Sequence, residues 1–261
     1  MSPAQTPLYQ RIAAELRRDI TSGVIKPGDK LPTEVQLVER LKVSRDTIRD
    51  ATAVLIHEGL VERVPGRSGG MVVRDRVVVT FRASWAEDPG GPRSEADSWI
   101  SEVRDQGLTP SQIFSCHNVT LTAEIADLLR LDGPGPGVLR RCVRYVNGKP
   151  SSIQDTYYPK WLTDLVPDLL SPEDIKIGTT RLLAERGHVQ TGYLDRLQAR
   201  MATPDEAGIL ALGAGTPVLL QTRIAMTATR VVRVTIVTAA GDRNLAEYEI
   251  GDLSALAGEP G

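Results

Sequence analysis

The stretch that decides the fold of the first part of the chain is TEVQLVERLKVSRDTIRDATAVLIHEG, residues 33–59. Thr33 begins it, and the Glu-Val-Gln that follows completes the pattern of a helix capping box. Ser44 is a second helix-capping residue, and Gly59 is of the type that follows a last helical turn. The stretch therefore predicts two helices joined by a tight turn at residues 42–44, which is the spacing of a helix-turn-helix.

The residues on either side complete a small domain. Pro7 is suited to a helix start, and apolar residues then recur at helical spacing as far as Ile20. After Gly59, the β-prone residues 60–64 and 71–73 flank a run rich in glycine, which predicts a β-hairpin. Three helices and a hairpin make a winged helix-turn-helix, which we place at residues 1–75.

The third helix of this domain carries the candidate DNA-reading residues. In a helix-turn-helix the second helix of the motif enters the major groove with its N-terminus first. Arg45 and Arg49 share one face of it, with Thr47 beside them, and arginine can bond O6 and N7 of guanine together. Ser44 and the helix N-terminus can hold a phosphate. The apolar residues Ile48, Ala51 and Leu55 fall on the inward face.

The hairpin tip has little side-chain bulk and one cation. Gly66, Arg67 and Ser68 could therefore enter a minor groove, where Arg67 meets a negative potential. Both elements have an ordinary alternative. The hairpin tip can be a plain surface loop, and the helix can present a solvated face, a reading that Asp46 and Asp50 favour because carboxylates repel phosphate.

The charge distribution supports contact with DNA through one module. The 261-residue chain has a formal net charge of -2, yet residues 40–74 contain seven basic side chains and four acidic ones. A basic face on an otherwise acidic chain suits a protein that touches DNA with one part of its surface.

Several classes of protein are excluded by what the sequence lacks. Cys116 and Cys142 do not make a disulfide framework, so a reducing cytoplasm is expected. We expect no leader peptide and no membrane span, because charged residues interrupt every apolar run. The histidines His57, His117 and His188 are far apart, so we expect no metal site, and no cofactor is expected either.

The rest of the chain mixes helices and strands. We expect a connecting strand at residues 77–81, a linker at residues 76–97 centred on the turn-forming residues 88–92, an α+β domain at residues 98–253, and a flexible tail at residues 254–261. Strands are predicted near residues 113–119, 138–146, 152–158, 193–202, 218–225 and 231–239. Helices are predicted near residues 95–106, 123–131, 159–170, 179–187 and 204–212, and residues 133–137 read as a turn before a strand. Because strands and helices do not alternate strictly along the chain, a largely antiparallel sheet is predicted.

Four motifs in the first domain resemble, in order and spacing, the signature of the GntR family of transcription regulators. They are PLY (residues 7–9), GVIKPGDKLPTE (23–34), VSRDTIR (43–49) and EGLV (58–61), and the resemblance covers about residues 3–74. It implies that Arg45, Thr47 and Arg49 contact bases or backbone, that Gly66 and its neighbours form the wing, and that Tyr9 and Thr33 contact phosphates. Val35 stands where many members have arginine, which implies a different operator.

The second domain resembles the UTRA effector domain of the HutC subfamily, whose fold is like that of chorismate lyase. The residues that carry this resemblance are SW (98–99), GLTP (107–110), VLRR (138–141) with Arg144, NGKP (147–150), QDTYYP (154–159) and GDR (241–243). The resemblance implies a pocket between sheet and helices that binds small polar or anionic effectors.

The residues expected at this pocket follow from that resemblance. A helix start suits an anion because of its free N–H groups, and arginines would supply positive charge. Alternatively, the arginines lie on a solvated strand face. Cys142 stands where arginine is frequent, and Gln154 and Arg233 stand where glutamate is frequent, which favours an effector less charged than a sugar phosphate; Ala239 and Ala240 replace a usual Tyr-Arg. The expected effector-binding residues are Ser98, Trp99, Ile100, Arg141, Arg144, Gln154, Tyr157, Arg233 and Thr235.

Together these observations predict a DNA-binding transcription regulator. We expect a homodimeric repressor that binds double-stranded palindromic operators and is released by a small-molecule effector. One alternative is a constitutive repressor whose second domain only dimerises. The other is a lyase-like enzyme, but fold does not imply function, and the sequence shows no Ser-His-Asp arrangement, metal spacing or acid pair. We therefore expect no enzymatic activity.

Overall fold

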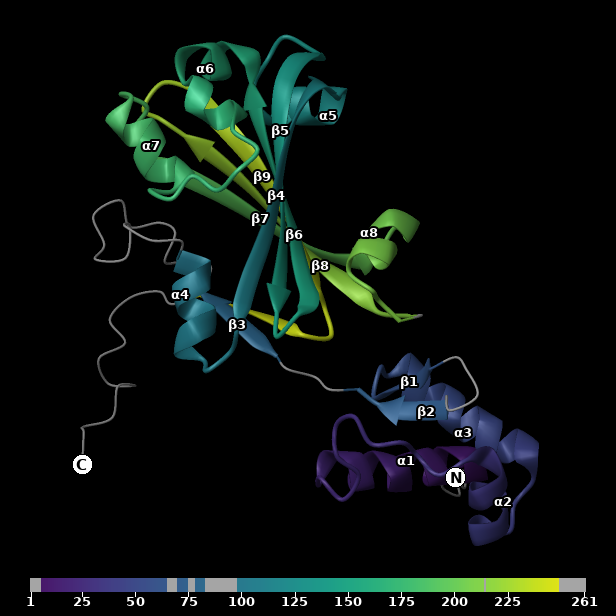
Figure 1. Ribbon diagram of the computed structural model, residues 1–261. Helices are drawn as coiled ribbons and strands as arrows, with labels where there is room; N and C mark the ends of the chain where they lie inside the picture. Colours follow the sequence, from purple (N-terminus) through teal and green to yellow (C-terminus); the bar gives the residue numbers. More distant parts are fainter. Residues whose placement is uncertain (1–5, 65–69, 75–77, 83–97, 214, 249–261) are drawn as a thin grey trace. The chain divides into compact units, whose positions relative to one another are not determined.

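The computed structural model describes residues 6–64, 70–74, 78–82, 98–213 and 215–248 (Figure 1). Contacts divide the chain into a first unit, residues 1–77 with 212–216, and a second unit, residues 78–211 with 217–261. Within the described ranges, none of the helices is long and apolar enough to cross a bilayer. The predicted linker turn at residues 88–92 and the predicted tail lie outside the described residues.

The first unit is a winged helix-turn-helix, as predicted. The side chain of Thr33 accepts from the backbone N–H of Gln36, and the Gln36 amide oxygen accepts from that of Thr33, so the predicted capping box is present. Lys42, in the left-handed conformation at φ 53°, makes the turn to the cap at Ser44. Its elements are α1 (Leu8–Thr21), α2 (Glu34–Leu41), α3 (Arg45–His57), β1 (Val61–Val64) and β2 (Gly70–Val73).

Apolar faces of the three helices and the hairpin make one core. The predicted inward face of α3 is confirmed, since Ile48, Ala51 and Leu55 have no exposed surface. Each fully buried leucine or isoleucine contributes about 1.5–3 kcal/mol. This packing leaves the opposite face of α3 to the solvent. The other buried members are Ile12, Ala13, Leu16, Leu31, Leu37, Val61, Met71 and Val73.

The second unit contains a six-stranded antiparallel sheet, which confirms the predicted α+β class. Its strands have the order β4-β5-β6-β9-β8-β7. They are β4 (Pro110–Leu121), β5 (Gly135–Val146), β6 (Lys149–Pro159), β7 (Gly192–Met201), β8 (Pro217–Met226) and β9 (Val231–Ala240).

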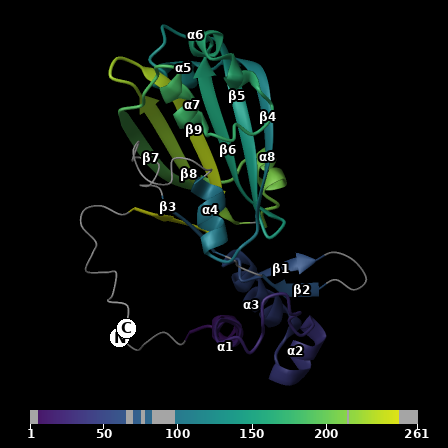
Figure 2. The same cartoon turned by 60° about the vertical axis from the view of Figure 1, so that its left-hand side comes forward.

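Helices lie on both faces of this sheet (Figures 1 and 2). One face, which we call the α4 face, carries α4 (Ser98–Asp105), α6 (Lys160–Leu165) and α7 (Thr179–Glu185). The other, the α5 face, carries α5 (Ala123–Leu128) and α8 (Pro204–Ile209). Tyr158, Leu162 and Leu183 are among the buried residues beneath α6 and α7. A separate cluster, which includes Ile125, Ile224 and Val234, lies beneath α5.

A small parallel pair lies beside α4. β3 (Val79–Arg82) pairs with β10 (Asn244–Glu247), a four-residue strand that the sequence reading missed. The side-chain amide of Gln106, the residue that follows α4, holds β3: its oxygen accepts from the Thr80 N–H at 3.0 Å and its nitrogen donates to the Thr80 carbonyl at 2.7 Å. This amide therefore bonds β3 as a neighbouring strand would.

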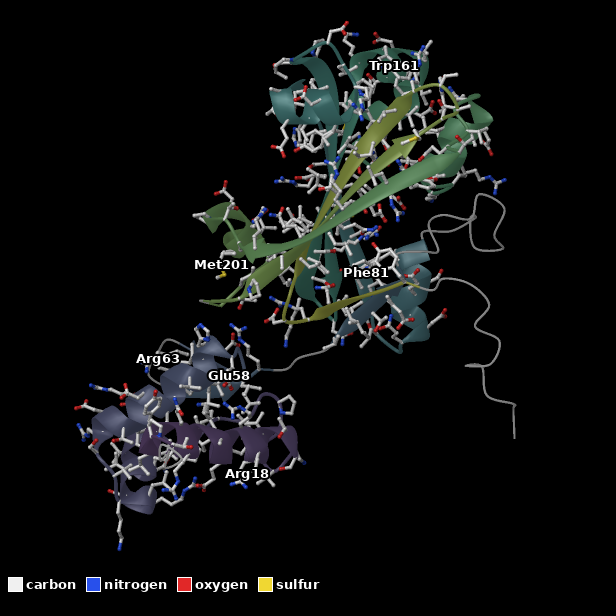
Figure 3. The ribbon with its side chains drawn as sticks, turned by 180° about the vertical axis from the view of Figure 1, so that it is seen from behind. Arg18, Glu58, Arg63, Phe81, Trp161 and Met201 are labelled. Atoms are coloured by element: carbon white, nitrogen blue, oxygen red, sulfur yellow. The ribbon has the colours of Figure 1, made fainter. Side chains whose placement is uncertain are left out.

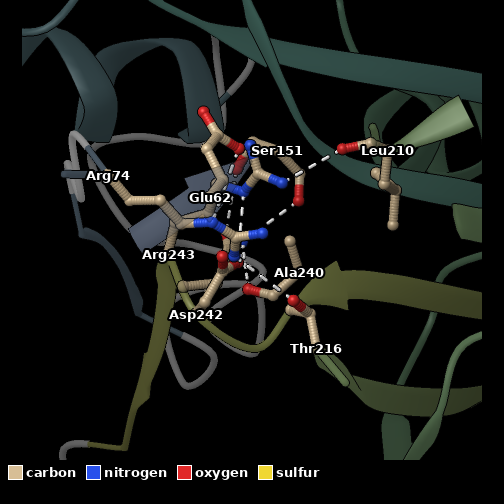
Figure 4. A network of polar contacts seen from close by, with 9 residues as sticks. Glu62, Arg74, Ser151, Leu210, Thr216, Ala240, Asp242 and Arg243 are labelled. Atoms are coloured by element: carbon tan, nitrogen blue, oxygen red, sulfur yellow. Dashed lines mark hydrogen bonds and ion pairs between the residues drawn. The ribbon is translucent and has the colours of Figure 1, made fainter. Parts of the chain in front are cut away.

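The turn between β9 and β10 is fixed by side-chain hydrogen bonds (Figure 4). Arg243 donates to the Leu210 carbonyl at 3.0 Å, and Asn244 donates to the carbonyls of Ala240 and Ser151 at 2.9 and 3.0 Å. Gly241 is required there, because a Cβ atom would lie 2.7 Å from the Pro217 carbonyl oxygen.

Two predicted elements are corrected. The single helix predicted at residues 159–170 is α6 followed by a 3-10 helix, Pro167–Leu170, because Pro167 has no N–H with which to continue α6. The turn predicted at residues 133–137 is shorter, since β5 already begins at Gly135. Gly137 is needed within that strand, because a Cβ atom would lie 2.7 Å from the Leu121 side chain.

Candidate DNA interface and effector site

The N-terminus of α3 presents the residues predicted to read DNA. Ser44 Oγ accepts from the Thr47 N–H at 3.2 Å and lies 2.8 Å from Thr47 Oγ1, so the cap is closed by local bonds. Arg45 and Arg49 are both exposed, while Thr47 is half-buried. Two guanidinium groups thus project one helical turn apart from a helix whose other face is fixed in the core.

A carboxylate that the sequence reading did not single out lies next to this surface. Glu34, at the start of α2, is 3.5 Å from Arg49 Nε and 3.4 Å from Arg63 Nη2 on β1. Asp46 lies 3.9 Å from Arg49 Nη1. The Arg49 side chain is still 63% exposed, and ion pairs this exposed contribute about 0–1 kcal/mol. Glu34 therefore links α3 to the hairpin without occupying Arg49 fully.

The other residues predicted to contact DNA are placed less uniformly. Thr33 is exposed, and its hydroxyl serves the α2 cap. Tyr9 is half-buried, and its hydroxyl accepts from the Gln10 amide at 3.1 Å. Gly66, Arg67 and Ser68 lie outside the described residues, although the strands that lead to them, β1 and β2, are paired from Val61 to Val64.

In the second unit, three residues predicted to bind an effector share the α4 face of the sheet. On β5, Cys142 is two residues from Arg144, and it pairs with Gln154 on β6. On β6, Thr156 is two residues from Gln154, and it pairs with Thr235 on β9. Because alternate residues of a strand point the same way, all three side chains belong to one face.

Trp99 identifies this as the face beneath α4. The Arg144 guanidinium carbon is 5.0 Å from the centroid of the Trp99 ring, and Trp99 is 5% exposed. Ile100 follows on α4 and is half-buried; Ser98 begins the helix, and its side chain is not described. The structure thus brings Trp99, Arg144, Gln154 and Thr235 to one side of the sheet.

Two buried donors lie side by side in this region. Arg144 Nε and Gln112 Nε2 are buried with no hydrogen-bond partner in the described part of the chain, and Gln112 is directly opposite Arg144 on β4. A buried donor left without an acceptor costs about 1–3 kcal/mol. Two such donors in one place therefore favour the binding of a group that accepts hydrogen bonds. The sequence analysis did not predict Gln112 as a site residue, although the alternation of side chains along β4 could have indicated which face it lies on.

The remaining arginines on the α4 face have partners. Arg140, 6% exposed, donates to the carbonyls of Leu169, Ser171 and Glu173, and Arg223 forms a bidentate pair with Asp195, with Nε 2.8 Å from Oδ1. Arg144, by contrast, has neither a carboxylate within ion-pair distance nor a hydrogen bond from Nε among the described residues.

Arg233, also predicted for the effector site, lies on the α4 face beneath α7. Its two terminal nitrogens donate to the hydroxyls of Thr179 and Thr180 at 2.7 and 2.9 Å. These bonds attach the start of α7 to β9, so the terminal nitrogens of Arg233 serve the helix rather than Trp99; its Nε is buried with no hydrogen-bond partner among the described residues.

Arg141 and Tyr157 lie on the α5 face, apart from the other predicted effector residues. Arg141 is three residues from Arg144, and Tyr157 three from Gln154, which places each on the opposite side of its strand. Arg141 pairs with Asp155, with Nε 2.7 Å from Oδ1. Burial, together with the Asp155 carboxylate, raises the pKa of Tyr157. The structure therefore does not bring this pair together with Trp99 and Arg144.

Comparison with known proteins places both units. The family of bacterial regulatory proteins named gntR matches residues 8–70, and the UTRA domain matches residues 105–244, more than half of the chain. The repressor NagR of Bacillus subtilis is 25% identical over 230 residues, 82% of each chain. The histidine utilization repressor of Pseudomonas putida is 28% identical over 225 residues, 84% of this chain and 82% of that one.

Solved structures agree in fold. A GntR-family regulator superposes with a TM-score of 0.66 at 24% identity, covering 95% of this chain and 99% of the other. PhnF from Mycobacterium smegmatis gives a TM-score of 0.55 at 22% identity, covering 92% and 99%. Since both family models match, one over each unit, the chain belongs to the GntR family of bacterial transcription regulators and carries a UTRA domain.

Proposed function

We propose that the protein is a homodimeric repressor that binds a palindromic operator and leaves it when the UTRA domain binds a small molecule. In this proposal residues 1–75 read DNA, residues 98–253 bind the effector and dimerise, and the protein acts in the cytoplasm. Its relatives are named as transcriptional repressors, so the chain is a regulator and not an enzyme. The observation that carries the proposal is the pair of exposed arginines on the capped N-terminus of α3.

The operator is read by Arg45, Thr47 and Arg49 in the major groove. Ser44, Thr33 and Tyr9 hold phosphates, and the wing residues Gly66, Arg67 and Ser68 enter the minor groove. Arginine contacts to guanine fix the sequence, and each such contact is worth about 1–3 kcal/mol of discrimination. Glu34 moves from Arg49 when the guanidinium meets a base.

The effector binds beneath α4, between Trp99 and the sheet. Arg144 offers one positive charge that no described carboxylate neutralises, and Gln112 and Gln154 add amide groups beside it. A ligand with a single negative charge and an adjacent hydrogen-bond acceptor fits this set. A doubly charged phosphate would need a second guanidinium with free N–H groups, and terminal nitrogens of Arg140, Arg223 and Arg233 already donate to groups within the fold.

The second copy covers the α5 face in this proposal. Ile236 and Leu220 at its centre are only half-buried, and Ile113 and Leu194 towards its edges are 59% and 45% exposed. The helices described on that face, α5 and α8, have six residues each. Two copies related by a two-fold axis would present two recognition helices to the half-sites of a palindrome.

The DNA-reading part is tested by measuring operator affinity. An operator is first selected from random double-stranded DNA with the full chain, and fluorescence anisotropy then gives its Kd. We expect Arg45→Ala and Arg49→Ala each to weaken binding by about 1–3 kcal/mol, roughly 5-fold to 150-fold. Arg18→Ala, which removes an exposed cation from the last turn of α1, is the matched control. Unchanged affinity in both recognition-helix variants would overturn the assignment.

The effector part is tested by thermal unfolding of the full chain with a panel of small organic anions. A ligand that binds the native state raises Tm, and the same ligand should lower operator affinity. Arg144→Gln should abolish both effects, while Arg181→Gln, at an exposed position on α7, should keep them. A constitutive repressor with a purely dimerising domain would show neither effect with any ligand.

A further inference from the structure

A pocket lies at the end of the sheet remote from Trp99. It has a volume of about 470 Å³, and its walls are α6, residues 187–191 after α7, and the turn between β8 and β9. β9 begins at Val231, beside this turn. Near its other end, Ala239 pairs with Ser152, which in turn pairs with Arg144. At the usual rise per strand residue, Val231 and Ala239 are about 25 Å apart. Trp161 marks this end of the unit in Figure 3. The pocket is therefore distinct from the site beneath α4.

The pocket combines an aromatic wall with an unneutralised cation. The guanidinium carbon of Arg230 is 4.6 Å from the Trp161 ring centroid, and the His188 ring meets the same tryptophan edge-on at 5.9 Å. Its lining residues include neither aspartate nor glutamate, and Arg230 makes no ion pair with any described residue. Stacking over the ring leaves the N–H edge of Arg230 available to an acceptor.

The acids of the neighbouring helix and of the 3-10 helix after it are already paired. Asp164 of α6 lies 2.5 Å from Lys160, and Asp168 lies 2.9 Å from Arg186. Because these carboxylates have cations of their own, an arriving anion would not need to displace one from Arg230. The local electrostatics favour a negatively charged ligand.

The turn that carries Arg230 is held in place. Thr227 Oγ1 accepts from the N–H groups of Thr229 and Arg230, each at 3.3 Å, and donates to the Arg230 carbonyl at 3.2 Å. The Thr227 N–H also donates to the Arg230 carbonyl at 2.9 Å. The guanidinium is therefore carried by a fixed backbone, which reduces the entropy lost on binding.

A buried amide lies behind the wall at residues 187–191. Gln190 is 2% exposed, and neither its amide oxygen nor its amide nitrogen has a hydrogen-bond partner in the part of the chain that the structure describes. It stands between two residues that line the pocket, Val189 and Thr191. Gln190 is not itself a lining residue, so its amide marks a polar group beneath this wall that lacks a partner among the described residues, rather than a contact with the ligand.

We propose that this pocket binds a small planar carboxylate, an aromatic monocarboxylic acid, as a second ligand of the UTRA domain. The carboxylate accepts from Arg230, and the ring lies against Trp161 and the apolar side chains of Leu165 and Val189. The volume suits a molecule of one ring and its substituents. The site goes beyond the proposed effector site, since it shares no residue with Trp99, Arg144 or Gln112.

Benzoate is the probe for the test, and the indole N–H signals of the full-length chain are the readout in two-dimensional NMR. The chain has three tryptophans, Trp85, Trp99 and Trp161, so single Trp→Phe variants assign the signals. Benzoate should shift the Trp161 signal saturably and leave the Trp99 signal in place. Arg230→Gln should weaken binding at least tenfold, and Arg181→Gln, on the exposed face of α7, should not change it.

Two further probes separate the contributions of ring and charge. Acetate keeps the charge without the ring, and benzyl alcohol keeps the ring without the charge; each should bind at least tenfold more weakly than benzoate. The proposal is overturned if benzoate does not saturate the Trp161 signal, if acetate binds as well as benzoate, or if Arg230→Gln binds normally. A benzoate response at Trp99 alone would also overturn it, whereas failure of operator release in the earlier experiments would leave it intact.

Discussion

The arginines of α3 and the arginines of the six-stranded sheet differ in what surrounds them. Arg49 is 63% exposed, and its carboxylate partners lie at 3.5 and 3.9 Å. Arg140 is 6% exposed and donates to three backbone carbonyls, while Arg223 makes a bidentate pair with Asp195. Arg49 therefore has hydrogen-bonding capacity left over, whereas the two arginines of the sheet use theirs within the fold.

The difference shows that the number of arginines in a domain says little about where it binds an anion. What matters is whether a guanidinium has already been satisfied, because a satisfied one contributes stability and a free one contributes affinity. By this criterion Arg144 and Arg230, which contact tryptophan rings rather than carboxylates, resemble the arginines of α3 although they lie in the sheet unit.

The largest effect should come from removing a satisfied arginine. Arg140→Ala leaves the buried carbonyls of Leu169, Ser171 and Glu173 without their shared donor, so we expect a loss of about 3 kcal/mol in the free energy of unfolding. Urea unfolding followed by circular dichroism measures it. Arg181→Ala, at an exposed helix position, is the control and should change stability by less than about 0.5 kcal/mol. Equal losses of stability in the two variants would show that Arg140 does not stabilise the fold more than an exposed arginine does.

A smaller effect should follow acid titration of a satisfied pair. Arg200 bonds both carboxylate oxygens of Glu206 at 2.7 Å, and with the Thr203 backbone N–H it lowers the pKa of Glu206 from its ordinary 4.5 to about 2. A depressed folded-state pKa stabilises the fold above about pH 4.5, and this contribution is lost as the pH falls toward 2. It amounts to about 2 kcal/mol at neutral pH, allowing for partial exposure.

Glu206→Gln should therefore remove part of the fall in stability between pH 4.5 and pH 2. Thermal unfolding at a series of pH values gives the profile. Glu185→Gln, which removes an exposed carboxylate from a one-turn pair on α7, should reproduce the wild-type profile. A Glu206→Gln profile that parallels the wild type over this range would show that the pair is not held as its geometry indicates.

The smallest effect is expected at the carboxylate next to the recognition helix. Glu34→Gln keeps the shape of the side chain but removes a negative charge that faces both Arg49 and Arg63. We expect affinity for unrelated DNA to rise by a factor of about 2 to 5, and the difference between operator and unrelated DNA to shrink, because free guanidinium groups bind phosphate without regard to sequence. Anisotropy titrations at two salt concentrations measure both quantities. Glu39→Gln, at an exposed position on α2, is the charge-matched control.

Local signals in the sequence predicted the first unit closely. Thr33 and Ser44 are caps because their side chains bond backbone N–H groups three residues away, and such short-range chemistry can be read from a few letters. The inward positions of Ile48 and Leu55 followed from helical period alone. Glu34 was overlooked as a charge partner because Arg63, on β1, becomes its neighbour only after the hairpin has folded against the helices.

In the second unit, the face on which a strand residue lies could be predicted from the sequence, but its neighbours on other strands could not. Arg141 and Arg144 are three residues apart on one strand, so alternation alone should have assigned them to opposite faces. Gln112, in contrast, becomes the neighbour of Arg144 through a pairing between strands 32 residues apart, and Arg140 meets carbonyls about 30 positions further on. Contacts of that range depend on register, which a single sequence does not specify.

The amide of Gln106 has a mechanical consequence. Gln106 directly follows α4 and bonds Thr80 through two hydrogen bonds, of 3.0 and 2.7 Å, so a displacement of β3 along its axis would be passed to the C-terminal end of α4. The same helix carries Trp99 against Arg144. A connection held by two hydrogen bonds would transmit a displacement of β3 to α4, whereas a flexible glycine-rich connection would absorb it.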